Sequence, residues 1–175
     1  MTLDPAWLAG RLRDVPDFPR PGIVFKDLTP LLADVEAFAA TVAALVDHAS
    51  GLGVDKVVAI EARGFIFGSA VAHGLKAGFV PVRKPGKLPW RTVRETYELE
   101  YGTDTLEVHE DAVSPGDAVY VVDDVLATGG TAAATCRLVN RLGGHVAGMG
   151  FVVELGFLDG RARLPDTSVN SLITV

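Results

Sequence analysis

The sequence predicts an α/β domain in which helices flank a mainly parallel central sheet. Four short runs, at residues 56–60, 79–82, 118–122 and 146–153, consist almost wholly of apolar residues. Such runs are typical of parallel strands that are covered on both faces. Helix-like segments separate the runs, and strands that alternate with helices join through right-handed crossovers. We therefore expect a single domain over residues 1–175, with no linker.

The connecting segments carry helix signals at regular places. Asp4 is a typical helix-capping residue, and Pro5 suits the first helical position, so a short helix is expected there. Residues 34–49 have one apolar face at helical spacing, and residues 64–76 and 131–142 are also helix-like. Residues 14–22 contain three prolines and are predicted to be irregular, with a brief extended piece at 23–25. A final strand is expected at 171–175.

The interval from residue 83 to residue 111 does not fit this alternation. Connections of that length are usually lids or binding loops. Alternating apolar and polar residues at 92–99 and 105–109 predict a β-hairpin arm. All charged residues from 83 to 94 are basic, and all those from 95 to 111 except His109 are acidic. We interpret Glu107 and Glu110 as part of a solvated hairpin with cross-strand pairs, while the basic half suits a diphosphate.

Composition and the chain ends exclude several classes of function. Sixteen Lys and Arg against 22 Asp and Glu give a formal net charge of −6, which disfavours nucleic acid and membrane surfaces as partners. The single Cys136 cannot form an intrachain disulfide and is expected to be a small core residue. No apolar run approaches the ~18 residues of a membrane span, and no signal peptide is recognised. We expect a cytoplasmic protein whose four histidines, which lack metal-ligand spacing, are structural or lie at the surface.

The segment 121–131 carries the most specific chemical signal. An apolar strand leads into Asp123 and Asp124, then into a turn of small residues and a helix. Ligands of open α/β sheets bind at the carboxyl ends of strands, and a helix N-terminus favours an anion. The absence of a following Gly-Lys-Ser/Thr excludes the Walker loop, and the glycine spacing excludes the dinucleotide fingerprint. The two acids fit the hydroxyls of a phosphorylated sugar, or Mg²⁺ held directly, and the alternative is an ordinary turn with an acidic cap.

Two further residues have a chemical interpretation and a structural alternative. Arg63 follows a buried strand end, where its guanidinium can bind diphosphate oxygens bidentately, although it can also be a surface arginine of the next helix. Phe25 lies in a loop rich in Pro and Gly, where a purine face would cover it. The alternative for Phe25 is a core anchor.

Residues 121–131 resemble the phosphoribosyl-diphosphate (PRPP) signature of the type I phosphoribosyltransferases. Four more segments resemble, in chain order, parts of the adenine-using branch of that family: the base-binding hood segment (19–27), the diphosphate loop (61–65) and two parts of the mobile lid (82–89 and 99–102). The resemblance implies the type I phosphoribosyltransferase fold, with a small N-terminal hood (1–33) and a long mobile lid loop (83–111). It also implies a non-proline cis peptide between Glu61 and Ala62.

The resemblance further implies a reaction in purine salvage, in which the 5-phosphoribosyl group of PRPP passes to adenine and gives AMP and diphosphate. It places catalytic roles on Glu100, as general acid/base, and on Arg63, Asp123 and Asp124, with Tyr101 of the lid orienting Glu100. The implied PRPP-binding residues are Arg63, Arg83, Lys84, Lys87, Asp123, Asp124, Ala127, Thr128, Gly129, Gly130 and Thr131. The implied base-binding residues are Val24, Phe25, Lys26 and Val125.

The implied cofactor is Mg²⁺, bound mainly through PRPP and without a dedicated protein site. The implied assembly is a homodimer, in which some lid cations reach the partner's site. Two other functions stay open at this point: transfer to another purine, such as guanine, hypoxanthine or xanthine, and regulation through PRPP binding without turnover. Regulators of this fold lose the catalytic lid, whereas this chain keeps Glu100 and the basic residues before it.

Overall fold

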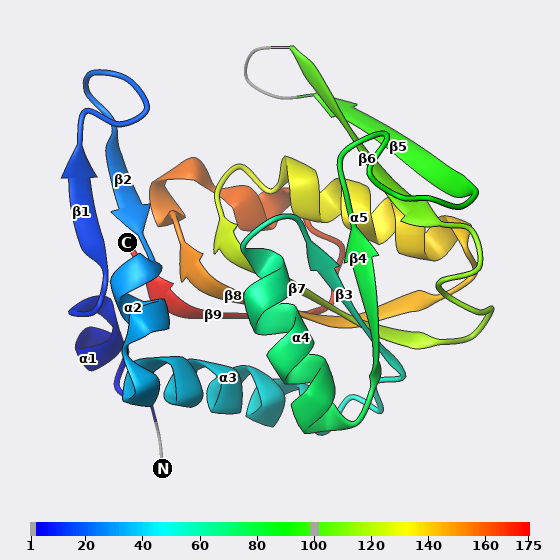
Figure 1. Ribbon diagram of the computed structural model, residues 1–175, viewed down its shortest axis with the longest axis horizontal. Helices are drawn as coiled ribbons and strands as arrows, with labels where there is room; N and C mark the ends of the chain where they lie inside the picture. Colours follow the sequence, from blue (N-terminus) through cyan, green and yellow to red (C-terminus); the bar gives the residue numbers. More distant parts are fainter. Residues whose placement is uncertain (1–2, 99–101) are drawn as a thin grey trace.

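The computed structural model describes residues 3–98 and 102–175 and is built on a five-stranded parallel sheet (Figure 1). All the strand pairs of this sheet run parallel, as the uninterrupted apolar runs predict. The strands, in spatial order, are β4 (Gly78–Val82), β3 (Lys56–Ile60), β7 (Ala118–Leu126), β8 (His145–Glu154) and β9 (Ser168–Thr174).

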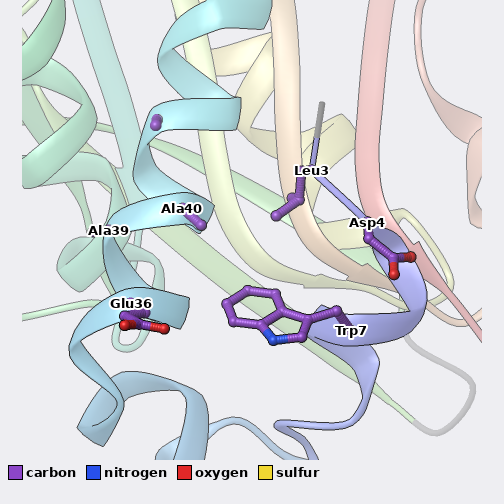
Figure 2. A pocket seen from close by; sticks show the side chains of 7 residues that line it. Leu3, Asp4, Trp7, Glu36, Ala39 and Ala40 are labelled. Atoms are coloured by element: carbon purple, nitrogen blue, oxygen red, sulfur yellow. The ribbon is translucent and has the colours of Figure 1, made fainter. Parts of the chain in front are cut away.

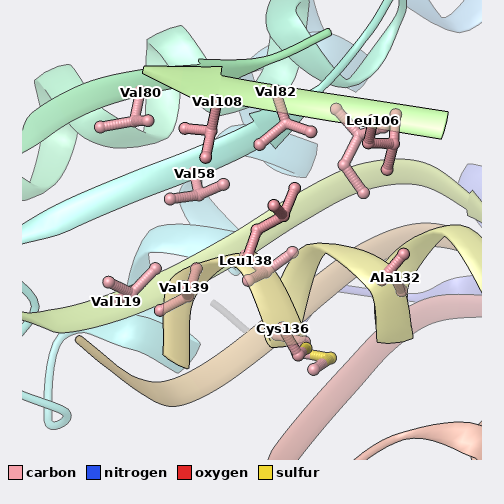
Figure 3. Packing of buried hydrophobic residues seen from close by; sticks show 14 of the residues in the cluster. Val58, Val80, Val82, Leu106, Val108, Val119, Ala132, Cys136, Leu138 and Val139 are labelled. Atoms are coloured by element: carbon pink, nitrogen blue, oxygen red, sulfur yellow. The ribbon is translucent and has the colours of Figure 1, made fainter. Parts of the chain in front are cut away.

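Helices cover both faces of the sheet, so two apolar layers form. Helices α3 (Val35–Ala49) and α4 (Gly64–Leu75) pack on one face, and α5 (Gly130–Arg141) packs on the other. Side chains of β7 alternate between the layers: Val119 and Val121 join the cluster under α5 (Figure 3), and Tyr120 and Val122 join the cluster under α3 and α4. None of the described helices combines the length and the apolar character needed to cross a bilayer.

Local signals account for the helix ends and for the cysteine. The Asp34 carboxylate accepts hydrogen bonds from the backbone N–H groups of Glu36 and Ala37, both at 3.0 Å, which caps α3. Helix α4 ends where Lys76 adopts a left-handed conformation with φ of 57°. Cys136 is buried within α5, and this burial raises the pKa of its thiol to about 12, so the core interpretation is confirmed.

The N-terminal part contains a short helix, α1 (Pro5–Ala9), an antiparallel ribbon of β1 (Arg13–Pro16) and β2 (Val24–Asp27), and α2 (Thr29–Ala33). The prediction of irregular structure from residue 14 is therefore wrong for β1. Its strand conformation depends on pairing with β2, which no local pattern records. Pro16 is tolerated because it lies at the end of the strand, where a missing N–H matters least.

The predicted hairpin arm is present as β5 (Thr92–Glu98) and β6 (Thr103–His109), paired in register over seven residues. The interpretation of Glu107 as solvated is wrong, because this residue is only 1% exposed. Backbone hydrogen bonds join Glu107 to Arg83, just after β4, so this part of β6 docks on the sheet. The Glu107 carboxylate lies 2.5 Å from Arg94 Nε and accepts a hydrogen bond from Gly86 N at 3.1 Å.

A groove of about 840 Å³ lies between α1 and α3, with Trp7 on one wall and Ala40 on the other (Figure 2). The guanidinium of Arg11 lies 4.8 Å from the Trp7 ring centroid. This groove shares no described lining residue with two other cavities, which lie at the carboxyl end of the sheet.

Candidate active site

Strand β7 is longer than predicted and includes the predicted acidic pair. The expectation that the strand ends at Val122 is wrong, because pairing with β8 continues through Asp123 opposite Phe151 to Leu126 opposite Glu154. Backbone pairing does not require apolar side chains, so polar residues extend a strand where their side chains can reach a cavity. Asp123 and Asp124 are therefore held by a strand within the sheet.

Asp124 is buried and forms an ion pair with Arg63, with 2.5 Å between Oδ2 and Nε. Within the part of the chain that the structure describes, this oxygen makes no hydrogen bond of good geometry. Arg63 lies between β3 and α4, directly after a cis peptide that joins Glu61 to Ala62. The structure thus contains the non-proline cis bond that the resemblance implies. It also brings the end of β3 against the end of β7, which are neighbouring strands.

Asp123 is half-buried beside this pair. Its Oδ1 accepts a hydrogen bond from Asp124 N at 2.9 Å, and a Cβ atom at Gly64 would lie only 2.7 Å from the same oxygen. Glycine at the start of α4 therefore allows the helix to begin against this carboxylate. Desolvation, and secondly the negative charge of Asp124, raise the pKa of Asp123 well above its usual value. An acid with a raised pKa in a cavity wall is typical of a functional site.

The turn after β7 has the features expected of an anion site. Gly129 adopts φ of 78°, and a Cβ atom there would lie 2.2 Å from the carbonyl oxygen of Gly160, in the short 3₁₀ helix η2 (Gly160–Arg163). Among the described residues, no side chain caps the first N–H groups of α5. A small cavity of about 70 Å³ lies at this turn, with Thr128 and Thr131 in its wall.

A larger cavity, of about 420 Å³, adjoins the turn. It shares Asp123 and Thr131 with the small one, so the two are compartments of one site. Its wall brings together five residues of the predicted PRPP set: Arg63, Lys84, Asp123, Asp124 and Thr131. Three further lining residues, which sequence reasoning missed, are Glu61, Tyr97 and Asp104.

Two of these missed acids hold three basic residues of the lid. The Glu61 carboxylate accepts hydrogen bonds from Arg83 Nε at 3.1 Å, from the backbone N–H of Lys84 at 2.8 Å, and from Lys87 Nζ. Asp104 pairs with Lys84 Nζ. Burial favours the neutral form of Glu61, but the hydrogen bonds from Lys87, Lys84 and Arg83 outweigh it and hold the pKa of this carboxyl below its usual value. The sequence signal for Glu61 was its place two residues before Arg63.

The four predicted base-binding residues lie in two places. Val24 is exposed on the ribbon, and Lys26 pairs with Asp14 at 2.6 Å. Phe25 is half-buried, with its ring centroid 5.2 Å from that of Phe18 and 5.3 Å from the guanidinium carbon of Arg63.

Phe25 does not belong to either apolar cluster of the described chain, which disfavours the core-anchor alternative. Val125 is half-buried at the end of β7 and lines the small cavity. Glu100 and Tyr101 lie outside the described residues.

The described residues do not contain a group of three or more His, Cys, Asp or Glu side chains that could hold a metal ion. Asp123 and Asp124 nevertheless both line the larger cavity. Mg²⁺ usually keeps several waters and binds through one or two carboxylates together with substrate phosphates. The donor set therefore fits an ion that arrives with a phosphorylated substrate.

Comparison with known proteins places this chain in a family. The family model described as "Phosphoribosyl transferase domain" matches residues 27–170, and the chain belongs to that family. The chain is 60% identical over 166 residues to an adenine phosphoribosyltransferase of Acidobacterium capsulatum, covering 95% of this chain and 92% of the relative.

Two solved structures extend the similarity to the fold. The adenine phosphoribosyltransferase of Rhodothermus marinus superimposes with a TM-score of 0.93 at 53% identity, covering 97% of each chain. The Saccharomyces cerevisiae enzyme, complexed with an imino-altritol bisphosphate and adenine, has a TM-score of 0.89 at 40% identity, covering 95% of this chain and 99% of that one.

Proposed function

We propose that this protein transfers the 5-phosphoribosyl group of PRPP to adenine in purine salvage, forming AMP and diphosphate. The observation that carries the proposal is the convergence of Arg63, the Asp123–Asp124 pair and the glycine turn on one two-compartment site. The high identity of this chain to adenine phosphoribosyltransferases, and the adenine bound in the yeast relative, support adenine as the base.

Each compartment suits one part of PRPP. The turn from Ala127 to Thr131 binds the 5-phosphate through free N–H groups and hydroxyls. Asp123 and Asp124 accept hydrogen bonds from the ribose hydroxyls. Arg63 and the lid cations Arg83, Lys84 and Lys87 bind the diphosphate. The lid cations pair with Glu61 and Asp104 in this structure, and the diphosphate replaces these two carboxylates as their partner.

The hood and the end of β7 supply the base site. Phe25 stacks on the purine face, and the groups around Val24, Lys26 and Val125 contact its edge. N9 of adenine attacks the anomeric carbon as the bond to the diphosphate oxygen breaks, so positive charge develops on the ribose and negative charge on the leaving group. Asp123 and Asp124 stabilise the first charge, and Arg63 and the lid cations stabilise the second.

Glu100 acts as the general acid/base at the purine, with Tyr101 orienting it. When bound, mainly through PRPP oxygens near Asp123 and Asp124, Mg²⁺ supplies additional positive charge at the diphosphate. Residues 83–111 serve as the lid and residues 1–33 as the hood of one domain spanning residues 1–175. Closure of the lid excludes water from the reacting carbon.

We propose that the active form is a homodimer in the cytoplasm, with no nucleic-acid or membrane partner. Strand β4 is an edge strand of the sheet, and its Phe79 is exposed beside α4, which exposes Ile66. An apolar surface of this kind at a sheet edge favours association with a second copy.

One assay tests the reaction. The protein is incubated with PRPP, Mg²⁺ and each purine in turn, and nucleotide and diphosphate are measured. We expect AMP from adenine and little product from guanine, hypoxanthine or xanthine. Preferred turnover of a keto purine would move the assignment to another purine, and tight PRPP binding without turnover would indicate a regulator.

The Glu100→Gln variant tests the general acid/base. Loss of a positioned acid/base lowers kcat by about 10²–10⁴-fold. Unchanged AMP formation at saturating substrates would remove Glu100 from this role while leaving the substrate assignment intact.

A further inference from the structure

Tyr97 of β5 reaches the substrate cavity from the core. Its side chain is 6% exposed and packs in the apolar cluster under α5. A Cβ atom at Gly130 would lie 3.4 Å from Tyr97 Cδ2, so the ring lies against the first residue of α5. The phenolic hydroxyl lies 3.1 Å from Thr131 Oγ1 and 3.3 Å from Asp104 Oδ2. Asp104 is also the direct cross-strand partner of Tyr97 in the hairpin.

The proton count of this trio restricts its arrangement. A tyrosine hydroxyl has one proton to donate, and an ionised carboxylate only accepts. When Tyr97 donates to Asp104, the short contact with Thr131 requires the threonine hydroxyl to donate to Tyr97. A phosphate oxygen in the turn also only accepts, so Thr131 must then direct its proton to the phosphate. Tyr97 can then donate its proton to Thr131 Oγ1, so that each hydroxyl donates one hydrogen bond and Thr131 also accepts one.

We propose that Tyr97 is a positioning residue for the phosphate turn, acting through Thr131. It holds Thr131 Oγ1 at the boundary between the two compartments and changes its hydrogen-bond acceptor from Asp104 to Thr131 when a sugar phosphate binds. The identity of that sugar phosphate rests on the proposed function, but the geometry requires only a phosphate at the turn. Before the diphosphate takes over Lys84, Asp104 pairs with this lid cation, so the trio then links it to the phosphate turn.

The Tyr97→Phe variant isolates the hydroxyl, because phenylalanine keeps the ring that packs in the core. We expect the Kd for PRPP with Mg²⁺, measured by calorimetry, to rise about 3- to 10-fold, the range that one neutral hydrogen bond supplies. The KM for adenine should remain near its wild-type value.

Thr96→Val is the matched control. Thr96 is the preceding residue of the same hairpin, and its hydroxyl bonds to that of Thr105 at 3.0 Å on the exposed side. Thr96 is not among the described lining residues of the two site compartments. We expect this variant to bind PRPP as the wild type does.

A double-mutant cycle separates positioning from a general effect on structure. In a Thr131→Val background, Tyr97→Phe should cause no further rise in the Kd for PRPP, because its effect passes through the Thr131 hydroxyl. The proposal is overturned if Tyr97→Phe binds PRPP normally, if its effect persists at full size without the Thr131 hydroxyl, or if Thr96→Val reproduces it.

The cycle does not depend on turnover. A wild-type protein that binds PRPP but forms no AMP would overturn the proposed reaction, while the cycle would still decide the role of Tyr97. A wild-type protein that does not bind PRPP would overturn both.

Discussion

Strands β7 and β8 run side by side, and both carry acids at their carboxyl ends: Asp123 and Asp124 on β7, and Glu154 on β8. Arg161 of η2 donates from Nε to both carboxylate oxygens of Glu154, at 2.8 and 2.9 Å. The same guanidinium continues to the carbonyl oxygen of Val169 and to the hydroxyl of Ser171 on β9. Glu154 is thus fully engaged in joining η2 to the edge of the sheet.

The acids of β7 are arranged differently. Two carboxylates are adjacent, and among the described residues Arg63 forms an ion pair with Asp124. The electrostatic consequences are opposite: hydrogen bonds from Arg161 lower the pKa of Glu154, whereas desolvation and Asp124 raise the pKa of Asp123. Equivalent strand ends therefore serve different purposes, since the paired acid contributes to stability and the under-compensated pair is available to a ligand.

The largest expected effect is on catalysis. Asp124→Asn should lower kcat by about 10²–10³-fold, because it removes a fixed negative charge from the developing cation, a loss comparable to that of one preorganised donor at a reacting centre. Glu154→Gln is the matched control on β8 and should change kcat little. Steady-state assays of AMP formation measure both, and equal losses would contradict the division between the two strands.

The next largest effect concerns the contact between the turn after β7, at Gly129, and η2, at Gly160. Gly129→Ala should lower the free energy of unfolding by about 2–4 kcal/mol, because the new methyl group meets Gly160 O while φ stays positive. Gly116→Ala is the control, since Gly116 has φ of 92° but nothing within 4 Å of its Cβ position. That variant should lose only about 1–2 kcal/mol. Denaturant unfolding measures both losses, and equal values would mean that the backbone contact contributes nothing.

A smaller effect concerns the paired acid. Glu154→Gln should lower the free energy of unfolding by about 1–2 kcal/mol at pH 7, because it weakens charged hydrogen bonds to a partly exposed arginine. The folded-state pKa of Glu154 is lowered, so its contribution is present above the unfolded pKa and is lost as the pH falls through the folded value. The difference between wild type and variant should therefore close in acid. A difference independent of pH would exclude the ion pair as its source.

The smallest effect has the opposite sign. Asp123→Asn should raise the free energy of unfolding by about 0.5–1 kcal/mol near pH 8, in the manner of active-site substitutions that exchange function for stability. The folded-state pKa of Asp123 is raised, so ionisation costs stability as the pH rises above the unfolded value. Thermal unfolding from pH 4 to pH 8 should show the gain only at the upper end. A loss of stability at pH 8 would contradict this account of the β7 acids.

The sequence by itself predicted the parallel sheet, the helices of its two faces, the hairpin arm, and the acids and glycines of the turn after β7. These features are recorded locally, because apolar periodicity, capping residues and glycine positions act over a few neighbouring residues. The resemblance to a family added roles for residues such as Glu100, which no local pattern assigns.

Only the tertiary structure decided which partners these residues have. It extended β7 through Asp123 by pairing with β8, paired β1 with β2, buried Glu107 and gathered the lid cations on Glu61. It also brought Tyr97 to Thr131, 34 positions away in the chain. Each of these contacts joins segments that are distant in sequence, and its free energy depends on burial and on partners that only the folded chain supplies. A local pattern can therefore indicate that an acid lies at a strand end, but the surrounding fold decides whether that acid is neutralised or remains available to a ligand.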